Sequence, residues 1–297
     1  AVSSDGGYIV GGYFGSSTIE LDNGITLTNK GSADSLDGMV IKYTINDIGN
    51  ANIKQGKTIG GSSSDYINSV AVSPDGGYIV VGHFRNRTIE SNNGIMVIKY
   101  DIDGNIELVK RIGGDKADQI TSVAVSPDGG YIVGGYFYGK TIELENGITL
   151  TNKGYENGMV IKYSAEGEAE WAKGIGGDKE DRITSVAVSS DGGYIVGGYF
   201  KSSTIELENG ITLTNKGYEN GMVIKYNAEG EAEWAKAIGG SGDDQIQTVT
   251  ASSDGGYIVG GYFRGTIELE NGITLTNKGS YDVMVIKYDI NGNIEWA

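Results

Sequence analysis

The chain repeats itself five times, and this repetition constrains its fold more than any other feature. An Asp-Gly-Gly triplet recurs at intervals of 70, 53, 63 and 63 residues, with its aspartate at Asp5, Asp75, Asp128, Asp191 and Asp254. In the clearest copy, residues 183–240, a short apolar strand at 185–188 precedes the triplet. Further strands are expected at 194–200, at 222–226 and around Trp234. A fixed period of this size is typical of repeat architectures, in which a single unit cannot bury its own apolar faces.

Each repeat is expected to form one small antiparallel sheet. The segments between the glycine-rich turns alternate in polarity and are rich in β-branched and aromatic residues, and none shows a sustained helical period with caps. The residues between the second and third strands, such as 204–217, are expected to form a hairpin arm. The sequence therefore predicts an all-β fold, a five-bladed β-propeller of four-stranded antiparallel blades with extra β-hairpin arms. We expect one domain over residues 1–297, with approximate blades at 1–61, 62–114, 115–177, 178–240 and 241–297.

Large apolar side chains are confined to equivalent places in the repeats, which predicts that they form the core. All five methionines begin the third strand, at Met39, Met96, Met159, Met222 and Met284. All five phenylalanines end the second strand, at Phe14, Phe84, Phe137, Phe200 and Phe263. Trp171, Trp234 and Trp296 are interpreted as packing between blades rather than as ligand platforms. The single histidine, His83, replaces a tyrosine of the second strand and is expected to be packed there.

Two repeats depart from the common pattern. The fourth strand of the first repeat, expected within residues 50–59, contains no tryptophan. In the second repeat the arm shrinks to residues 88–94, and Leu108 stands at the tryptophan position.

The recurring text resembles the bacterial beta-propeller repeat family often called SBBP. The resemblance is carried by the run Gly-Gly-x-x-x-Asp-x-Ile followed by Val-Ala-Val-Ser-x-Asp-Gly-Gly-Tyr-Ile-Val-Gly-Gly-Tyr-Phe, by the arm Ile-Thr-Leu-Thr-Asn-Lys-Gly and by Met-Val-Ile-Lys-Tyr. It covers essentially the whole chain, and it implies a propeller in a large secreted or surface-displayed bacterial protein. The resemblance implies no catalytic residues.

Composition excludes several classes of function. A net charge of −16 argues against a nucleic-acid partner, because phosphate binding requires a basic surface. The chain has no cysteine, so disulfide frameworks and thiolate metal sites are excluded. No apolar run approaches the roughly 18 residues that span a membrane. Because the chain starts and ends within the repeat pattern, we expect it to be part of a larger polypeptide.

The most promising surface for a ligand is the one that carries the arms. In an antiparallel blade, the long connection from second to third strand and the loop leading into the next repeat lie at the same end of the sheet, and long loops on a rigid scaffold often bind ligands. Our candidate ligand-binding residues on this face are Tyr155, Asn157, Tyr218, Asn220, Tyr281 and Asp282. A tyrosine beside an amide and an acid can stack on a sugar ring and hydrogen-bond to it. The alternative is that these residues form solvated hairpin tips.

Other recurring polar residues have structural interpretations. Asp65, Asp118, Asp181 and Asp244 could bind calcium or a glycan hydroxyl, but we expect each carboxylate to hold its own loop through backbone N–H groups. Residues 101–105 match only part of a calcium-binding loop and resemble a turn. Each repeat also has one lysine on its third strand, expected to form an ion pair or to extend its stem between blades: Lys42, Lys99, Lys162, Lys225 and Lys287.

Together these features predict a non-catalytic binding or display module of a secreted or cell-surface bacterial protein. It would mediate protein interaction or adhesion, with no cofactor and no metal. The alternative is a lectin-like propeller whose repeated weak sugar sites gain strength from avidity. A glycan-processing enzyme is the third hypothesis, since paired carboxylates are possible among 39 acidic residues, but none has a recognisable spacing.

Overall fold

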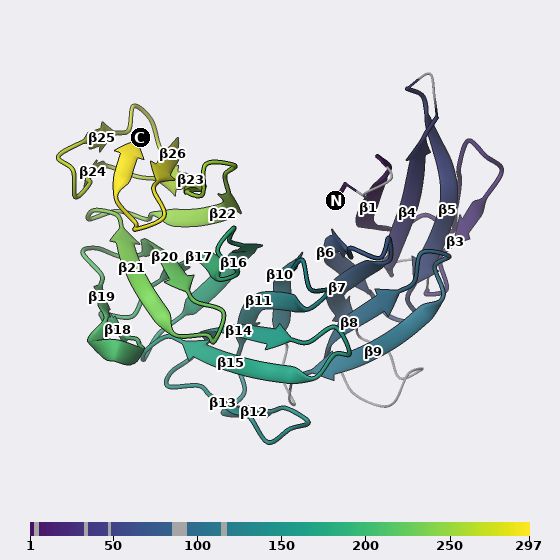
Figure 1. Cartoon of the computed structure of the whole chain (residues 1–297), viewed down its shortest axis with the longest axis horizontal. Helices are drawn as coiled ribbons and strands as arrows, with labels where there is room; N and C mark the ends of the chain where they lie inside the picture. Colours follow the sequence, from purple (N-terminus) through teal and green to yellow (C-terminus); the bar gives the residue numbers. More distant parts are fainter. Residues whose placement is uncertain (3–5, 33–34, 47–48, 85–93, 114–117) are drawn as a thin grey trace. The chain divides into compact units, whose positions relative to one another are not determined.

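The computed structural model describes residues 1–2, 6–32, 35–46, 49–84, 94–113 and 118–297. In these residues the chain consists of β-strands and turns, with a single 3₁₀ turn at Glu208–Gly210 (Figure 1). The predictions of an all-β fold and of almost no helix are confirmed. The turn of the first repeat at Asp5 and the short arm of the second repeat at 88–93 lie outside the described residues.

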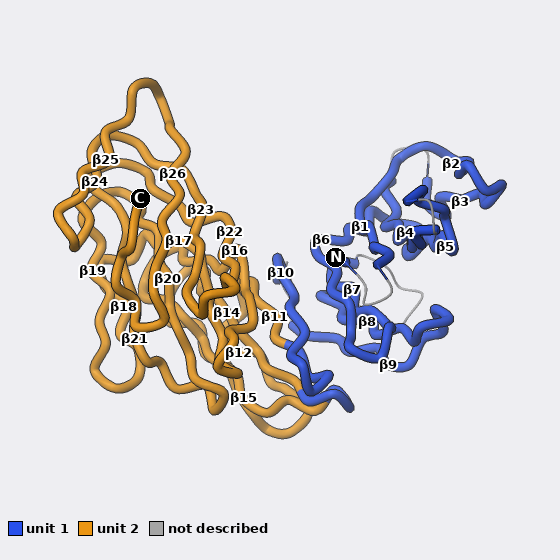
Figure 2. The backbone as a smooth tube through the Cα atoms, turned by 45° about the horizontal axis from the view of Figure 1, so that its top comes forward, with its two compact units in different colours: residues 1–131, 164–167 blue, residues 132–163, 168–297 orange. Residues whose placement is uncertain are grey.

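The chain divides into two compact units (Figure 2). The first contains residues 1–131 and 164–167. Its strands are β1 (Tyr8–Phe14), β2 (Thr18–Glu20), β3 (Thr26–Thr28), β4 (Asp37–Ile45), β5 (Ala51–Ile59), β6 (Tyr66–Val72), β7 (Tyr78–Phe84), β8 (Gly94–Tyr100), β9 (Ile106–Ile112) and β10 (Gln119–Val125).

The second unit contains residues 132–163 and 168–297. In the third and fourth repeats its strands are β11 (Tyr131–Phe137, whose first residue belongs to the first unit), β12 (Thr141–Glu143), β13 (Thr149–Thr151), β14 (Asn157–Tyr163), β15 (Ala169–Ile175), β16 (Asp181–Val188), β17 (Tyr194–Phe200), β18 (Thr204–Glu206), β19 (Thr212–Thr214), β20 (Asn220–Tyr226) and β21 (Ala232–Ile238). The fifth repeat supplies β22 (Gln245–Ala251), β23 (Tyr257–Phe263), β24 (Thr266–Glu268), β25 (Thr274–Thr276), β26 (Asp282–Tyr288) and β27 (Ile294–Trp296).

The repeats build antiparallel sheets whose strands are arranged in their order along the chain, with the arm strands left out of the sheet. Sheets of four strands have the order β6-β7-β8-β9, β16-β17-β20-β21 and β22-β23-β26-β27. Within the described residues, the first sheet contains three strands in the order β1-β4-β5. The predicted arms are the separate hairpins β2-β3, β12-β13, β18-β19 and β24-β25. Four-stranded antiparallel sheets with hairpin arms are thus confirmed, while the number of blades, the closure of a ring and the single domain stay predictions.

The Asp-Gly-Gly triplets form the tight turns between first and second strands. At Asp191 the carboxylate accepts the N–H of Gly193 at 2.9 Å, and the N–H of Ser189 donates to the carbonyl of Gly193 at 2.8 Å. Gly192 has a φ of 86°, a backbone conformation that costs a glycine nothing and other residues more. The triplet therefore specifies the hairpin turn through both its carboxylate and its glycine.

The expected core positions are buried in nearly every repeat. All five phenylalanines are buried, and so are four of the five methionines, while Met39 is half-buried beside its arm. His83 is buried on β7, as predicted for a packed strand residue. Burying such side chains supplies most of the stability of a small sheet, since each contributes about 1.5–3 kcal/mol.

Two of the three tryptophans pack against the following sheet. The ring of Trp171 on β15 lies 5.6 Å from the ring of Tyr194 and 5.9 Å from that of Tyr226, and its Nε1–H donates to the carbonyl of Ala228. It lies flat against Gly230, where an added Cβ would meet the ring at 2.5 Å. Trp234 makes the same contacts with the last sheet.

The packing prediction for Trp296 is wrong. Its side chain on β27 is 48% exposed. In the first repeat Gln55 takes the tryptophan position opposite Lys42, and its amide donates to the carbonyl of Asp103.

The recurring lysines are mostly buried and paired. Lys225 is 1% exposed, and its ammonium group lies 2.9 Å from Asp191 and 2.8 Å from Glu233, both belonging to the same sheet. Lys42 instead donates to the carbonyls of Gly76 and Ile102 in the following repeat. The ion-pair prediction is confirmed, although several pairs form within a sheet rather than between sheets.

Truncating Trp171 is expected to destabilise the second unit much more than truncating Trp296. Trp171→Ala removes a half-buried ring and should cost about 3 kcal/mol, the low end for this substitution. Trp296→Ala removes an exposed ring and should cost about 0.5 kcal/mol. Thermal denaturation followed by circular dichroism measures both. Equal melting temperatures for the two variants would refute the packing role of Trp171.

Candidate functional site

The arm tips and the loops between repeats lie side by side in the second unit. The backbone of Glu156 forms an isolated parallel β-bridge with that of Glu180, and Glu219 forms the same kind of bridge with Asp243. The N–H of Asp181 donates to the carbonyl of Glu156 at 2.9 Å, and that of Asp244 donates to Glu219 at 3.0 Å. We call the resulting surface the loop face: the tips at 155–157, 218–220 and 281–282, with the adjoining residues 180–182, 201–202, 243–245 and 264.

Buried aspartates hold this face in shape. The carboxylate of Asp181 accepts the backbone N–H groups of Gly177, Lys201 and Ser202 at 2.8–3.1 Å and the Ser202 hydroxyl at 2.6 Å. Asp244 accepts the N–H groups of Gly240 and Arg264 in the same way. The loop-holding interpretation of these aspartates is confirmed, because their oxygens are occupied by the chain itself.

The candidate asparagines also form hydrogen bonds within the tips. Asn157 and Asn220 are buried, and each side-chain oxygen accepts a backbone N–H from four residues earlier. Each amide N–H group donates to carbonyls of its own tip and of the next loop. Asp282 accepts the N–H of Lys278 at the same place in the last repeat. These three residues therefore position the tips, and a contact with a ligand is untested.

The candidate tyrosines are the exposed part of the tips. Tyr155 is 68% exposed and Tyr218 is 67% exposed. Tyr281 is 46% exposed, but it does not stand at the equivalent position. Phe263 pairs with Asp282 as Phe200 pairs with Asn220, so Tyr281 replaces Glu219. Its hydroxyl donates to Asp243 at 2.9 Å.

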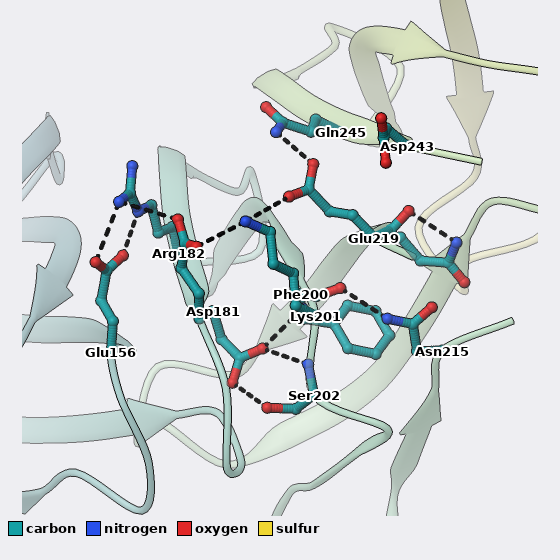
Figure 3. A network of polar contacts seen from close by, with 12 residues as sticks. Glu156, Asp181, Arg182, Phe200, Lys201, Ser202, Asn215, Glu219, Asp243 and Gln245 are labelled. Atoms are coloured by element: carbon teal, nitrogen blue, oxygen red, sulfur yellow. Dashed lines mark hydrogen bonds and ion pairs between the residues drawn. The ribbon is translucent and has the colours of Figure 1, made fainter. Parts of the chain in front are cut away.

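A ladder of alternating charges runs across the loop face (Figure 3). Both carboxylate oxygens of Glu156 accept from the Arg182 guanidinium, which also lies 3.0 Å from Glu180. Lys201 lies 2.6 Å from Glu180 and 3.5 Å from Glu219. Glu219 then accepts from the side-chain amide of Gln245. The ladder joins the third, fourth and fifth repeats through side chains alone.

The acidic ends of the ladder are buried, whereas its cations are partly open. The side chains of Glu156 and Glu219 are 0% and 5% exposed, and that of Arg182 is 27% exposed. Burial would lower the pKa of Arg182, but the hydrogen bond and charge of Glu156 outweigh it and raise the pKa. Burial raises the pKa of Glu219, partly opposed by Gln245 and Lys201. Removing one partner of such a pair leaves a buried charge uncompensated.

Aromatic rings accompany the cations. The guanidinium of Arg182 lies 4.3 Å from the centre of the Tyr136 ring, and the ammonium of Lys201 lies 5.7 Å from that of Tyr218. The ring of Tyr138 meets that of Tyr155 edge to face at 5.7 Å. Cation–π and edge-to-face contacts fix the rings in place without covering their outer surfaces.

A shallow groove of about 470 Å³ opens at the end of the ladder. It is lined by Tyr218, Ser241, Gly242, Asp243, Arg264 and Gly265. The groove thus presents an aromatic ring, a carboxylate and a guanidinium to solvent. These groups can bind a polar ligand but lack the paired acid and base that a hydrolytic reaction requires.

Within residues 1–2, 6–32, 35–46, 49–84, 94–113 and 118–297, no three His, Asp or Glu side chains gather as a metal site would require. The same residues contain no helix with the length and apolar character needed to cross a bilayer.

The charge ladder is the feature that sequence reasoning missed. Its members flank fixed landmarks of the repeat: Glu180 and Arg182 flank the loop aspartate, and Lys201 follows the phenylalanine of the second strand. Their side chains differ between repeats, so a search for recurring residues passes over them. Scanning for charged residues at landmark positions in neighbouring repeats would have found them.

Comparison with known proteins identifies a repeat family different from the one expected. Residues 53–90 and 106–143 match the model described as WD40, "WD domain, G-beta repeat". Both matches begin at a fourth strand, β5 or β9, and they start 53 residues apart, which is the interval between Asp75 and Asp128. The SBBP resemblance is therefore wrong as an assignment: the shared turns and strands are general to such repeats, and the model that matches is WD40.

Two curated relatives cover part of the chain. An uncharacterized WD repeat-containing protein of Acanthamoeba polyphaga mimivirus is 27% identical over 56% of this chain and 13% of its own length. The regulatory protein FlaEY of Caulobacter vibrioides is 24% identical over 67% of this chain and 22% of its own length. The chain thus spans less than a quarter of either relative.

Solved structures give weaker likenesses. The WD40 domain of Neurospora crassa Pan2 aligns with a TM-score of 0.36 and 10% identity, over 89% of this chain and 82% of that one. A puromycin hydrolase S511A mutant aligns with a TM-score of 0.37 and 11% identity, over 87% and 43%. No conclusion follows at these scores. A secreted or cell-surface location is tested by none of these comparisons and stays a prediction.

The raised pKa of Glu219 predicts a pH dependence of stability. Between the ordinary pKa of 4.5 and the higher folded value, the folded chain binds more protons than the unfolded chain. Because the Glu219 carboxylate is buried, the free energy of unfolding falls as pH rises through this window. At lower pH the side chain is protonated in both states, and its burial carries no charge penalty. Glu219→Gln should remove this pH-dependent loss of stability, because glutamine does not ionise. Urea unfolding of both proteins at several pH values from 4 to 7 should show the variant gaining stability relative to wild type as pH rises. The account would be contradicted if the stability gained by the variant over wild type became smaller as the pH rose.

Proposed function

We propose that this chain is a non-catalytic protein-binding module whose five repeats are blades of one β-propeller. The WD40 matches support this proposal, and so do the four-stranded antiparallel sheets. The proposed binding surface is the loop face of the second unit. Adhesion and display at a cell surface would be uses of such a module, and they belong to the proposal only as predictions.

The observation that carries the proposal is the exposure of two equivalent tyrosines on a rigid support. Tyr155 and Tyr218 expose about two thirds of their surface, while the residues beneath them are buried and hydrogen-bonded. Tyrosine and arginine are enriched where proteins meet, because they offer a large contact area together with polar groups. A support that is already ordered reduces the entropy lost on binding. A partner would therefore contact the tyrosine rings and the open sides of Arg182 and Lys201.

The groove beside Tyr218 supports a second candidate function, binding of glycans. A sugar ring could stack on Tyr218 and donate hydrogen bonds from its hydroxyl groups to Asp243, while Arg264 could donate hydrogen bonds to a sugar carboxylate. The two candidates share Tyr218 and differ in Tyr155, which does not line the groove.

Site-specific photo-crosslinking tests the protein-binding proposal. Benzoyl-phenylalanine replaces Tyr155 or Tyr218, or, as a matched control, Glu229 on the exposed turn between β20 and β21. After irradiation with proteins of the source cells, we expect a discrete adduct from both tyrosine positions and none from position 229. The adduct at position 155 should weaken in Arg182→Ala. Adducts from position 229 alone would contradict the proposed surface.

A glycan array distinguishes the second candidate. Binding to a glycan that is lost in Tyr218→Ala and kept in Tyr155→Ala would support a sugar site in the groove. No binding at high glycan density would remove this candidate and leave protein binding in place.

A further inference from the structure

The first repeat carries a different side chain at one position beside the arm. In the fourth repeat, Asn220 begins the third strand opposite Phe200. In the first repeat, Asp37 takes the same place opposite Phe14. An amide group both donates and accepts hydrogen bonds, whereas an ionised carboxylate only accepts them. The surroundings of Asp37 must therefore supply something that those of Asn220 need not.

The amide nitrogen of Asn220 is surrounded by oxygen atoms. It donates to the carbonyls of Glu219 and Gly240 at 3.0 and 3.2 Å, and it lies 3.4 Å from Oδ2 of Asp244. The other end of the amide, Oδ1, accepts the backbone N–H of Lys216 at 2.7 Å. A donor therefore suits the nitrogen position, and an acceptor suits the oxygen position.

The first repeat keeps the same hydrogen bonds around Asp37. Its Oδ2 accepts the backbone N–H of Lys30 at 2.7 Å. The carbonyl of Leu36 accepts the N–H of Asp65 at 2.6 Å. Oδ2 of Asp65 accepts the N–H of Gly61 at 2.8 Å. The fourth repeat has each of these bonds between the equivalent residues, so the oxygens that surround the asparagine amide there have counterparts in the first repeat.

The second carboxylate oxygen of Asp37 points to these acceptors. A Cβ added at Gly60 would lie 2.5 Å from Oδ1 of Asp37 and 3.0 Å from Oδ2 of Asp65. At the equivalent Gly239, an added Cβ would lie 2.2 Å from the amide nitrogen of Asn220 and 2.6 Å from the loop carboxylate. Oδ1 of Asp37 thus takes the place of the amide nitrogen, beside the second carboxylate.

Two carboxylates therefore lie close together in a buried place. Asp37 and Asp65 are both 0% exposed. Among the described residues, Oδ1 of Asp37 has no hydrogen-bond partner. Burying a carboxylate without compensation is costly, and a second carboxylate nearby adds repulsion. A cation that binds both carboxylates would offset both effects.

We infer that Asp37 and the loop at residues 60–65 form a binding site for one calcium ion. Oδ1 of Asp37 and Oδ2 of Asp65 supply the negative charge, and the carbonyls of Leu36 and Gly61 supply further oxygens. Calcium accepts about six to eight oxygen ligands in flexible geometry, including carboxylates, carbonyls and water. No centre of three acidic or histidine side chains occurs in the described residues, so the backbone and water provide the remaining ligands.

A bound ion would hold the start of the third strand to the loop that leads into the second repeat. In the fourth repeat the amide of Asn220 makes this connection through hydrogen bonds. The stability of the first unit would thus depend on calcium concentration, since a ligand of the folded chain shifts the unfolding equilibrium. The site lies in the first unit, whereas the loop face belongs to the second.

Isothermal titration calorimetry of the full chain with calcium chloride tests the site. After removal of divalent ions with a chelator, we expect one site with a dissociation constant on the order of 10⁻⁴–10⁻³ M, because only two of its ligands are charged. Asp37→Asn places the side chain of the fourth repeat at this position. It should keep the circular dichroism spectrum and weaken calcium binding at least about tenfold, since a charged ligand is lost. Magnesium chloride should bind more weakly than calcium chloride, because magnesium requires nearly octahedral geometry.

The chain also offers a variant that should gain a site. Asn220→Asp creates the same pair of carboxylates in the fourth repeat, with Asp244 as the second member. The stoichiometry of calcium binding should rise from one to two. The matched control is Asn209→Asp on the exposed 3₁₀ turn, which should leave the stoichiometry at one.

Three results would overturn the proposal. The first is equal calcium affinity of wild type and Asp37→Asn, which would place the ion elsewhere. The second is the absence of calcium binding by wild type at about 10 mM calcium chloride, well above the expected dissociation constant. The third is a stoichiometry of one in Asn220→Asp, and this result decides the question if Asp37→Asn does not fold.

Discussion

The rest of the structure depends on the first strand of each four-stranded sheet, which joins its own sheet and the preceding one at the same time. The bulged backbone of β16 lies against Gly198, where even a methyl group would strike a carbonyl oxygen. Ile246 and Val249 of β22 press onto Gly197 of the preceding sheet, where an added Cβ would lie 2.5 Å from Val249. Gly198 thus leaves room for the first strand at the edge of its own sheet, and Gly197 leaves room for the next sheet against its face. The second repeat has a valine at the face position, so the face contact tolerates more variation than the edge contact.

The polar organisation of the loop face follows from this packing. Once the first strand is in place, the aspartate at its start reaches the backbone after the second strand and closes the loop. The tips then lie next to these loops, and Glu156 and Glu219 become buried beside cations of the next repeat. Buried carboxylates are tolerated there because each is paired and hydrogen-bonded. The exposed tyrosines stand on this ordered base, so the proposed binding surface is a consequence of the sheet packing rather than an independent feature.

Much of the fold could be predicted from the sequence, because every repeat contains the same pattern of strands and turns. The phenylalanines, the Asp-Gly-Gly turns, the loop aspartates and the packing of Trp171 were predicted correctly, since their roles depend on local geometry that the repeat preserves. The exposure of Trp296 was missed because Trp296 occupies the same repeat position as Trp171 and Trp234, and position in the repeat alone does not fix exposure. The one-residue shift of Tyr281 and the ladder through Arg182 were missed because both depend on register between strands, which repetition alone does not reveal. The family assignment was wrong because short turns and strands are shared by several kinds of propeller repeat.

The most direct test of this account compares the free energy of unfolding of Gly198→Ala with that of Gly279→Ala. Both changes add one methyl group, but only Gly198 lies against the first strand of its sheet. The account predicts that Gly198→Ala displaces the bulged strand and costs about 1–3 kcal/mol or more, as overpacking does. Gly279→Ala should change the free energy of unfolding by less than about 0.5 kcal/mol, since nothing lies within 4 Å of the added methyl group. Equal free energies of unfolding for the two variants would contradict the claim that the first strand holds each sheet together.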